Sequence, residues 1–333
     1  MSNLQTEFGA VRVYDASPTG SGAYALRLKD RVVELGQKEF DRYKKLVDWL
    51  PTTRTAKDIA TEVGIDESKL ERFASKLEEA GLLFRRAKIP ATLSGEEFHR
   101  DYFSKMLPSW LVEAFSHPFW ERMMTGKGSA RLYNGWIIEL YHYTRNANRH
   151  MPLSSAYTHS KAIKTLRAKH YAEEWNHYHY FMKSLKALGY SSESIETSLP
   201  LPMTLALSNF MRQAAREDVL AYSVCSAVLE GTTTDRGAYN PYYEKAGELY
   251  GIPKAAIAPI YAHLDLDVQY GHSDLFFDIL KTVPVLTAER AGLVLSYGHQ
   301  LAEHVWLWTD NIEKYYDDAS NPMPRVPFDP TLD

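Results

Sequence analysis

Six side chains of the types that bind iron occur at helical spacing between residues 139 and 267. Glu174 and His177 are three residues apart, and His263 and Asp267 are four apart, so on a helix each pair would share one face. Carboxylates mixed with imidazoles suit iron or manganese better than they suit metals that prefer thiolates. Helical bundles hold pairs of irons with such residues on facing helices. The expected ligands are Glu139, Glu174, His177, Glu230, His263 and Asp267.

Two of these carboxylates stand in strongly apolar runs. Glu139 lies within YNGWIIELYHYT, where burying an unpaired carboxylate would cost several kcal/mol, so a metal or a basic partner is required. Glu230 follows VCSAVL and precedes a glycine that permits close helix packing. We expect Glu230 to bridge two metal ions and to be the catalytic carboxylate that shifts during the reaction.

The composition limits the class of protein. The 333 residues suffice for two ordinary domains, and a formal net charge of -4 indicates no attraction to nucleic acid or anionic lipid. No run approaches 18 apolar residues and the first residues lack an apolar signal core, so we expect no membrane contact and a cytoplasmic location. The single cysteine, Cys225, excludes an intramolecular disulfide and a cysteine-rich zinc site, and its apolar neighbours predict a core residue.

The chain divides near residue 90. We expect a small domain at 1–90, a catalytic domain at 91–320 and a flexible tail at 321–333. In the small domain, residues 23–35 predict two short strands, and a helix with apolar spacing follows at 39–50. Two more helices within TAKDIATEVGIDESKLERFASKLEEAGLLF are separated by one glycine and ended by another. This order describes an α+β, winged-helix-like domain.

The small domain resembles the peptide-chaperone family of pyrroloquinoline quinone biosynthesis, the precursor-peptide recognition element, in Arg31–Leu35, Lys57–Ala60 and Leu77–Leu83. The resemblance implies that a ribosomal precursor peptide adds as a strand to the sheet edge. A DNA-reading role is disfavoured because Glu67–Glu79 carries four glutamates against two lysines and one arginine. A domain that only covers the catalytic bundle or makes a homodimer contact stays open.

The rest of the chain predicts helix almost throughout. Prolines at 108, 152, 200, 202, 253 and 284 stand between the periodic segments, where they are expected to separate helices. The expected helices are 96–106, 109–125, 129–148, 153–188, 202–218, 219–232, 239–250, 254–281 and 286–317.

This second part resembles the heme-oxygenase-like diiron oxidases, which are related to the pyrroloquinoline quinone synthase and thiaminase II folds. The resemblance rests on Ile138–Thr144, Glu173–His177, Val228–Gly231 and Tyr261–Asp267, in the family's order. It implies a mostly α protein, a heme-oxygenase-like helical bundle beside the small domain. It also implies two irons, with manganese an option in one site, and a dioxygen-dependent reaction with an external electron donor. The outcomes open to the family are N- or C-oxygenation, desaturation and oxidative carbon–carbon cleavage in natural-product biosynthesis.

The chain departs from the family pattern at the last ligand. The family has a second histidine three residues after the aspartate, where this chain has Tyr270. His272 would reach the metal only if the helix were widened or unwound near Gly271. Tyr270 as a donor beside the metal is the other option, and a labile second iron is a third.

The substrate is expected to be an amino acid or a related molecule, free or within a peptide. His142, one turn from Glu139, is a candidate for orienting a ligand or the substrate. Arg145 and Arg167 are candidates for a bidentate contact with a substrate carboxylate.

Two other classes remain open from the sequence. One is a metal-independent enzyme of the same fold, either a cofactor-less oxidase or a thiaminase-type hydrolase that needs a cysteine nucleophile. The other is a non-catalytic peptide-binding protein in which the small domain is the active part.

Overall fold

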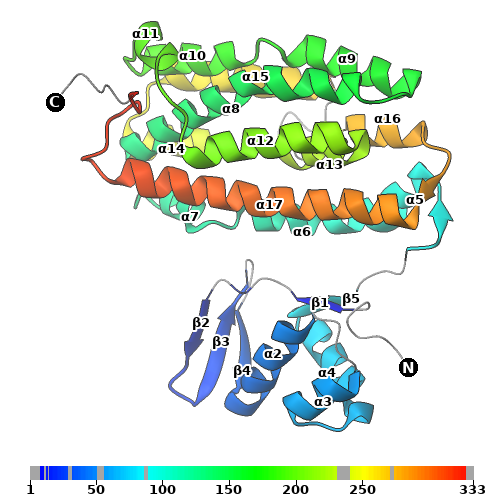
Figure 1. The fold of residues 1–333 in the computed structure, drawn as a ribbon. Coiled ribbons are helices and arrows are strands. Elements are labelled where there is room, and N and C mark those ends of the chain that lie inside the picture. The colour runs from blue at the N-terminus through cyan, green and yellow to red at the C-terminus, as the bar shows by residue number, and fades with distance from the viewer. Residues whose placement is uncertain are drawn as a thin grey trace. The chain divides into compact units, whose positions relative to one another are not determined.

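The chain forms two compact units, Met1–Ile89 and Pro90–Asp333. A computed structural model describes residues 8–10, 13, 15–28, 32–50, 56–85, 89–230, 241–270 and 274–327. Figure 1 shows the first unit as a small sheet with helices and the second as a bundle of helices.

The small unit is a short antiparallel sheet with three helices. The sheet has the order β2-β3-β4, and its strands are β2 (Asp15–Pro18), β3 (Ala23–Arg27) and β4 (Val32–Gly36). The helices are α2 (Gln37–Trp49), α3 (Ala56–Val63) and α4 (Glu67–Glu79), and β1 (Phe8–Ala10) pairs with β5 (Leu83–Arg85). The expected small α+β domain is therefore confirmed.

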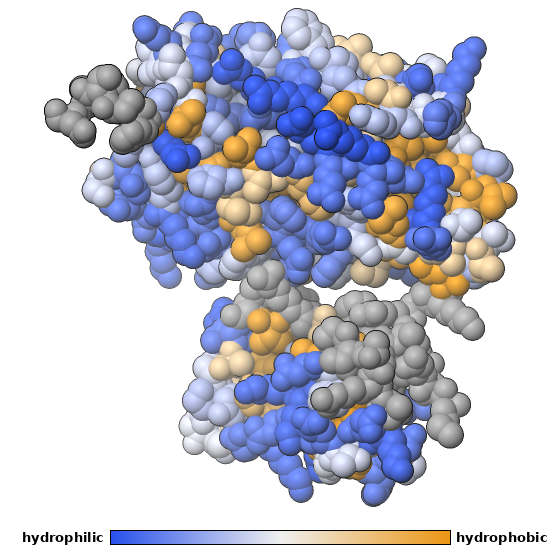
Figure 2. Space-filling model, viewed as in Figure 1, coloured by the Kyte–Doolittle hydropathy of each residue, from blue (hydrophilic) through white to orange (hydrophobic). Residues whose placement is uncertain are grey.

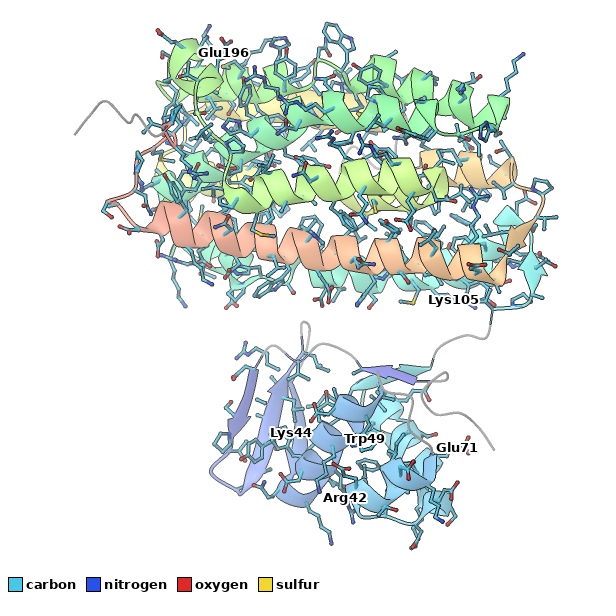
Figure 3. The ribbon with its side chains drawn as sticks, viewed as in Figure 1. Arg42, Lys44, Trp49, Glu71, Lys105 and Glu196 are labelled. Atoms are coloured by element: carbon cyan, nitrogen blue, oxygen red, sulfur yellow. The ribbon has the colours of Figure 1, made fainter. Side chains whose placement is uncertain are left out.

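One buried cluster joins the sheet of this unit to its three helices, and a glycine ends the last of these helices. Leu26 of the sheet and Leu46, Ile59 and Leu70, one from each helix, are fully buried in one cluster. Gly81 ends α4 with a φ of 73°, a conformation that costs glycine little, and its N–H bonds to the Glu78 carbonyl. Arg42, Lys44 and Glu71 on the same helices are labelled in Figure 3, and Arg42 Nη2 donates to the Gly64 carbonyl at 3.1 Å.

The second unit consists of a long helical bundle (Figure 1). Its first elements are β6 (Thr92–Leu93), α5 (Gly95–Phe98), a π-helical turn (His99–Phe103), α6 (Ser104–Phe115) and α7 (Pro118–Met124). Then follow α8 (Ala130–Ala156), α9 (Lys161–Glu174), α10 (Tyr178–Ala187), α11 (Ser192–Glu196), α12 (Pro202–Glu217) and α13 (Val219–Glu230). The last are α14 (Tyr242–Tyr250), α15 (Lys254–Tyr270), α16 (Leu275–Lys281), β7 (Leu286–Thr287), which pairs with β6, and α17 (Ala288–Asp317).

The central helix α8 packs against α9, α10, α12 and α17. Its buried stripe includes Leu132, Ile138 and Tyr141, as expected for a helix with neighbours on several sides. Figure 2 shows that the face of this unit turned to the viewer is mostly hydrophilic, with smaller hydrophobic areas. Within the described residues, no helix is both long and apolar enough to cross a membrane.

Two expected helix breaks are wrong. Pro108 lies inside α6 and Pro152 inside α8, because a proline removes one helical hydrogen bond and bends a packed helix without ending it. The chain breaks instead just before α9, where the Ser160 hydroxyl accepts from the Ile163 N–H at 3.3 Å. The expected helix 153–188 is thus the end of α8, all of α9 and α10.

Part of the expected flexible tail, residues 321–327, forms hydrogen bonds with the bundle, and the flexibility of the tail stays a prediction. Arg131 Nη2 donates to the Asn321 carbonyl at 2.5 Å, and Arg325 Nη1 donates to the Pro200 carbonyl at 2.8 Å. The Leu199 N–H donates to the Arg325 carbonyl at 2.9 Å. The prolines of this segment prevent regular structure but leave its carbonyls free to bond to the bundle.

The two glycines Gly292 and Gly298 of α17 provide a matched test of how closely this helix packs against α6. A Cβ at Gly298 would lie 2.6 Å from the ring of Trp110, whereas a Cβ at Gly292 would meet nothing within 4 Å. We expect Gly298→Ala to lower the free energy of unfolding by about 1–3 kcal/mol through overpacking. Gly292→Ala should raise it by about 0.5–1 kcal/mol, because alanine is the better helix former. Urea denaturation measures both, and equal effects of the two changes would contradict the close approach at Trp110.

Candidate metal centre

Four side chains converge between α9, α10 and α15. Glu174, His177, His263 and Asp267 each offer a ligand atom, and these atoms all lie within 4.8 Å of one another. His177 Nδ1 is 2.9 Å from Glu174 Oε2 and 3.7 Å from Asp267 Oδ1, and His263 Nδ1 is 3.1 Å from Asp267 Oδ2. We call these four residues the metal cluster.

A local tightening of the helix aligns the first pair. Residues 175–177 separate α9 from α10, and the His177 N–H donates to the Glu174 carbonyl at 3.1 Å. The Tyr180 N–H donates in turn to the His177 carbonyl at 2.9 Å. These i to i+3 bonds give three residues per turn, and in that geometry side chains three apart eclipse each other. Glu174 and His177 therefore share one face of this turn, where Nδ1 and Oε2 lie 2.9 Å apart.

The donor set fits a divalent cation. Two carboxylates balance two positive charges, and two neutral imidazoles complete four oxygen and nitrogen ligands. Donors bonded to one ion at about 2.1 Å lie at most about 4.2 Å apart, so the present arrangement needs only small side-chain movements. The His263 ring is held between His177 and Phe181, with ring centroids 4.7 Å and 5.1 Å away.

The metal cluster opens on a cavity of about 520 Å³. Glu174, His263 and Asp267 line it, and so does Glu230 from the end of α13. Most of the remaining lining is apolar or aromatic, a composition typical of small-molecule sites. The structure thus brings Glu230 to the same cavity but not into the four-residue cluster.

His170 is a histidine at this site that the sequence analysis did not select as a ligand. It is buried, and its Nε2 lies 3.3 Å from Glu230 Oε1, which also accepts from the Ser226 hydroxyl at 3.1 Å. On α9 it precedes Glu174 by four residues and therefore shares its face. The spacing of four residues from Glu174 was the feature of the sequence that could have identified His170. The contact with Glu230, which shows that His170 lies at this site, depends on the tertiary structure.

Tyr143 of α8 also lines the cavity. Burial raises the pKa of its hydroxyl well above the ordinary range, and the charges of Glu230 and Glu174 raise this pKa further. The phenol therefore keeps its proton close to both carboxylates.

Glu139 is not part of this site, which corrects the sequence-based assignment. The carboxylate is fully buried, and Oε2 accepts from the Leu201 N–H at 3.0 Å and from the Thr204 hydroxyl. Oε1 accepts from the Tyr316 hydroxyl at 2.8 Å. Neutral donors satisfy both oxygens, so the partner that burial requires is neither a metal nor a base.

Two of the candidate substrate contacts also lie elsewhere. His142 is buried against Ser198, whose hydroxyl is 2.9 Å from its Nε2, and burial lowers its pKa to about 4. Arg145 is exposed and bonds to the Tyr141 hydroxyl and to the carbonyl of Glu196, which Figure 3 labels on α11. Neither lines the cavity. Arg167 does not line it either, but it is buried on α9 and its guanidinium lies against the ring of Tyr222, which does line it.

The last ligand position stays a prediction. Tyr270, the final residue of α15, is 39% exposed and does not line the cavity. Gly271 and His272 lie outside the described residues.

Cys225 is a core residue, as expected. It is fully buried, burial raises the pKa of its thiol, and it does not line the cavity. Because it is the only cysteine of the chain, a cysteine nucleophile at this cavity is excluded.

Comparison with known proteins agrees with this geometry. Residues 134–297 match a family described as iron-containing redox enzyme. A solved domain of unknown function with a heme oxygenase-like fold, from Shewanella denitrificans, superposes with a TM-score of 0.59 at 19% identity, over 69% of this chain and 98% of that one. A TenA homolog from Pseudomonas syringae pv. tomato gives 0.50 at 11% identity, over 69% and 98%. No curated protein matches the chain. At these identities the structural likeness shows the fold alone.

Glu139 predicts a pH dependence of stability. Burial raises its pKa from 4.5 to about 7, so the folded state holds a proton that the unfolded chain releases between these values. The bound proton contributes on the order of 3 kcal/mol to the free energy of unfolding. This contribution is fully present below pH 4.5 and is lost as the pH rises through 7. Glu139→Gln, which stays neutral, should abolish this part of the slope when urea denaturation is compared from pH 5 to 8. Glu289→Gln, an exposed control, should follow the wild type, and an unchanged slope in Glu139→Gln would contradict the assignment.

Proposed function

We propose that this protein is a non-heme diiron oxidoreductase that uses dioxygen, on the support of the match of residues 134–297 to a family of iron-containing redox enzymes and of the heme oxygenase-like fold. The observation that carries the proposal is the metal cluster at the wall of a largely apolar cavity. An open coordination position facing such a cavity is what oxygen and a substrate need.

The first iron would be held by the metal cluster itself. Its two carboxylates and two histidines contain the two-histidine, one-carboxylate set that is typical of non-heme iron oxygenases. Imidazole nitrogens and carboxylate oxygens bind a metal only when they carry no proton. Metal binding therefore releases protons and should weaken at low pH.

The second iron would be held by Glu230 and His170, with Glu174 on the same cavity wall, and the bridging role expected of Glu230 stays a prediction. Glu230 and His170 are already in contact, and His170 and Glu174 share one face of α9. This arrangement would supply a histidine that the sequence lacks three residues after Asp267. Manganese in one of the two positions is compatible with the same donors.

Bound iron would supply the electrons and the binding position that dioxygen activation requires, with an external donor restoring the reduced state. The residues of the chain do the rest. Leu140, Phe181 and Val268 line the cavity and exclude water from the reacting group. Tyr143 lines the same cavity as Glu174 and Glu230, and because it keeps its phenolic proton it can donate a hydrogen bond to a group bound there.

The substrate remains an amino acid or a related molecule in this proposal, and oxygenation, desaturation and carbon–carbon cleavage all stay open. The small unit fits a peptide-binding role because β2 and β4 are both edge strands of its sheet. A thiaminase-type hydrolase is disfavoured because Cys225 lies away from the cavity.

His177 tests the metal cluster. We expect His177→Ala to fold but to lose at least one iron per chain after anaerobic loading, together with all turnover. His179→Ala is the matched control, since His179 is exposed two residues further on and should leave iron content unchanged. Elemental analysis with circular dichroism decides, and full iron content in His177→Ala would refute the cluster as an iron site.

Glu230 and His170 test the second iron. Glu230→Gln and His170→Ala should each keep the iron of the metal cluster and weaken the other by tenfold or more, the order expected when a supporting group is lost. Ferrous iron titration followed by optical spectroscopy under oxygen measures both sites. If His170→Ala retains two irons of unchanged affinity, His170 is structural and the ligand must be sought elsewhere.

A further inference from the structure

A buried arginine lies on the same helix face as the metal cluster. Arg167 is 1% exposed, its Nε donates to the Ser154 hydroxyl at 3.1 Å, and its guanidinium lies 4.5 Å from the ring centroid of Tyr222. Its Nη1 and Nη2 atoms are buried and have no hydrogen-bond partner among the described residues. No carboxylate of the described chain forms an ion pair with it.

This arrangement is costly for the protein alone. Arginine cannot shed its charge, and a guanidinium buried without a counter-ion costs several kcal/mol. A stacked tyrosine and one hydroxyl offset only part of that cost. Two free, coplanar N–H donors match the two oxygens of a carboxylate, the group that arginine binds best.

The neighbouring His150 points to the same class of ligand. It lines the cavity, its Nδ1 lies 2.8 Å from the Tyr222 hydroxyl, and its buried Nε2 has no partner among the described residues. Burial, then the positive charges of Arg167 and Arg212, lower its pKa to about 3, so the ring is neutral. A neutral imidazole beside a guanidinium can donate to an anion without repelling it.

The position of Arg167 relative to the metal cluster sets the length of that ligand. Arg167 precedes Glu174 by seven residues, two turns or about 10 Å along α9. The cavity between α8 and α13 carries Leu140, Met151 and Leu229 in its wall. An extended chain covers roughly 1.2 Å per bond, so about eight bonds would join a carboxylate at Arg167 to a reacting atom at the cluster.

We propose that Arg167, with His150 and Tyr222, binds the carboxylate of a substrate whose apolar chain runs through the cavity to the metal cluster. The role of the bound molecule as a substrate rests on the proposed function, whereas the binding of a carboxylate does not. A plain carboxylic acid and an α-amino acid share this chemistry.

Binding of three matched probes to the metal-free full-length protein tests the proposal. Octanoate and 2-aminooctanoate carry the carboxylate, and octanamide replaces it with a neutral group. Isothermal titration should show that at least one acid binds the wild type and that Arg167→Met weakens it by about a hundredfold, the loss expected for a bidentate charged pair. Arg167→Lys should give an intermediate loss, Arg145→Met should give none, and octanamide should not distinguish the proteins. The acid that binds more tightly identifies the source of the carboxylate.

Stability and iron content separate this proposal from a structural role and from the proposed function. Without ligand, Arg167→Met should not lower the thermal midpoint, because the wild-type charge is uncompensated, and it should bind as much iron as the wild type. A midpoint lowered by several degrees, binding that survives the substitution, or failure of both acids to bind the wild type would overturn the carboxylate site. Absence of iron binding in the wild type would refute the proposed function while leaving the carboxylate result standing.

Discussion

The cost of burying charge in a helical core governs this protein. The bundle takes carboxylates, imidazoles and a guanidinium into an interior made largely of aliphatic and aromatic side chains, where each charge requires a partner. At the junction of α9, α10 and α15 the partners are other ligand atoms, and the four residues that converge there could hold a cation between them. The tighter turn at 175–177 contributes to this convergence, since it puts Glu174 and His177 on one face.

Two carboxylates with the same sequence signal meet that cost in different ways. Glu139 and Glu230 both follow apolar residues on buried helices, and both looked like ligands. Glu139 is satisfied by Leu201, Thr204 and Tyr316 from distant parts of the chain, whereas Glu230 faces the cavity with His170. Local sequence shows that a partner is needed but cannot show which one tertiary packing supplies.

The same division separates what the sequence predicted from what it missed. Pairs within one helix, Glu174 with His177 and His263 with Asp267, were predictable because helical spacing alone puts them on one face. The helical class, the small domain and the glycine at the end of α4 were predictable for the same local reason. His170 and the ends of α8 and α9 were missed because they depend on contacts between helices, and prolines alone did not mark those ends.

The polarity of the cavity follows from these placements. Its lining carries Glu174, Asp267 and Glu230, which attract cations, and Tyr222, against whose ring the charged guanidinium of Arg167 lies. Cations bound at the carboxylates would neutralise their negative charge and so remove the repulsion that a carboxylate ligand would meet on entering. In the proposed binding mode, a molecule with one anionic end and one apolar end would then have a single favourable orientation, with its apolar end at the metal. The orientation of the reacting group would thus come from charges fixed on one face of α9, two turns apart.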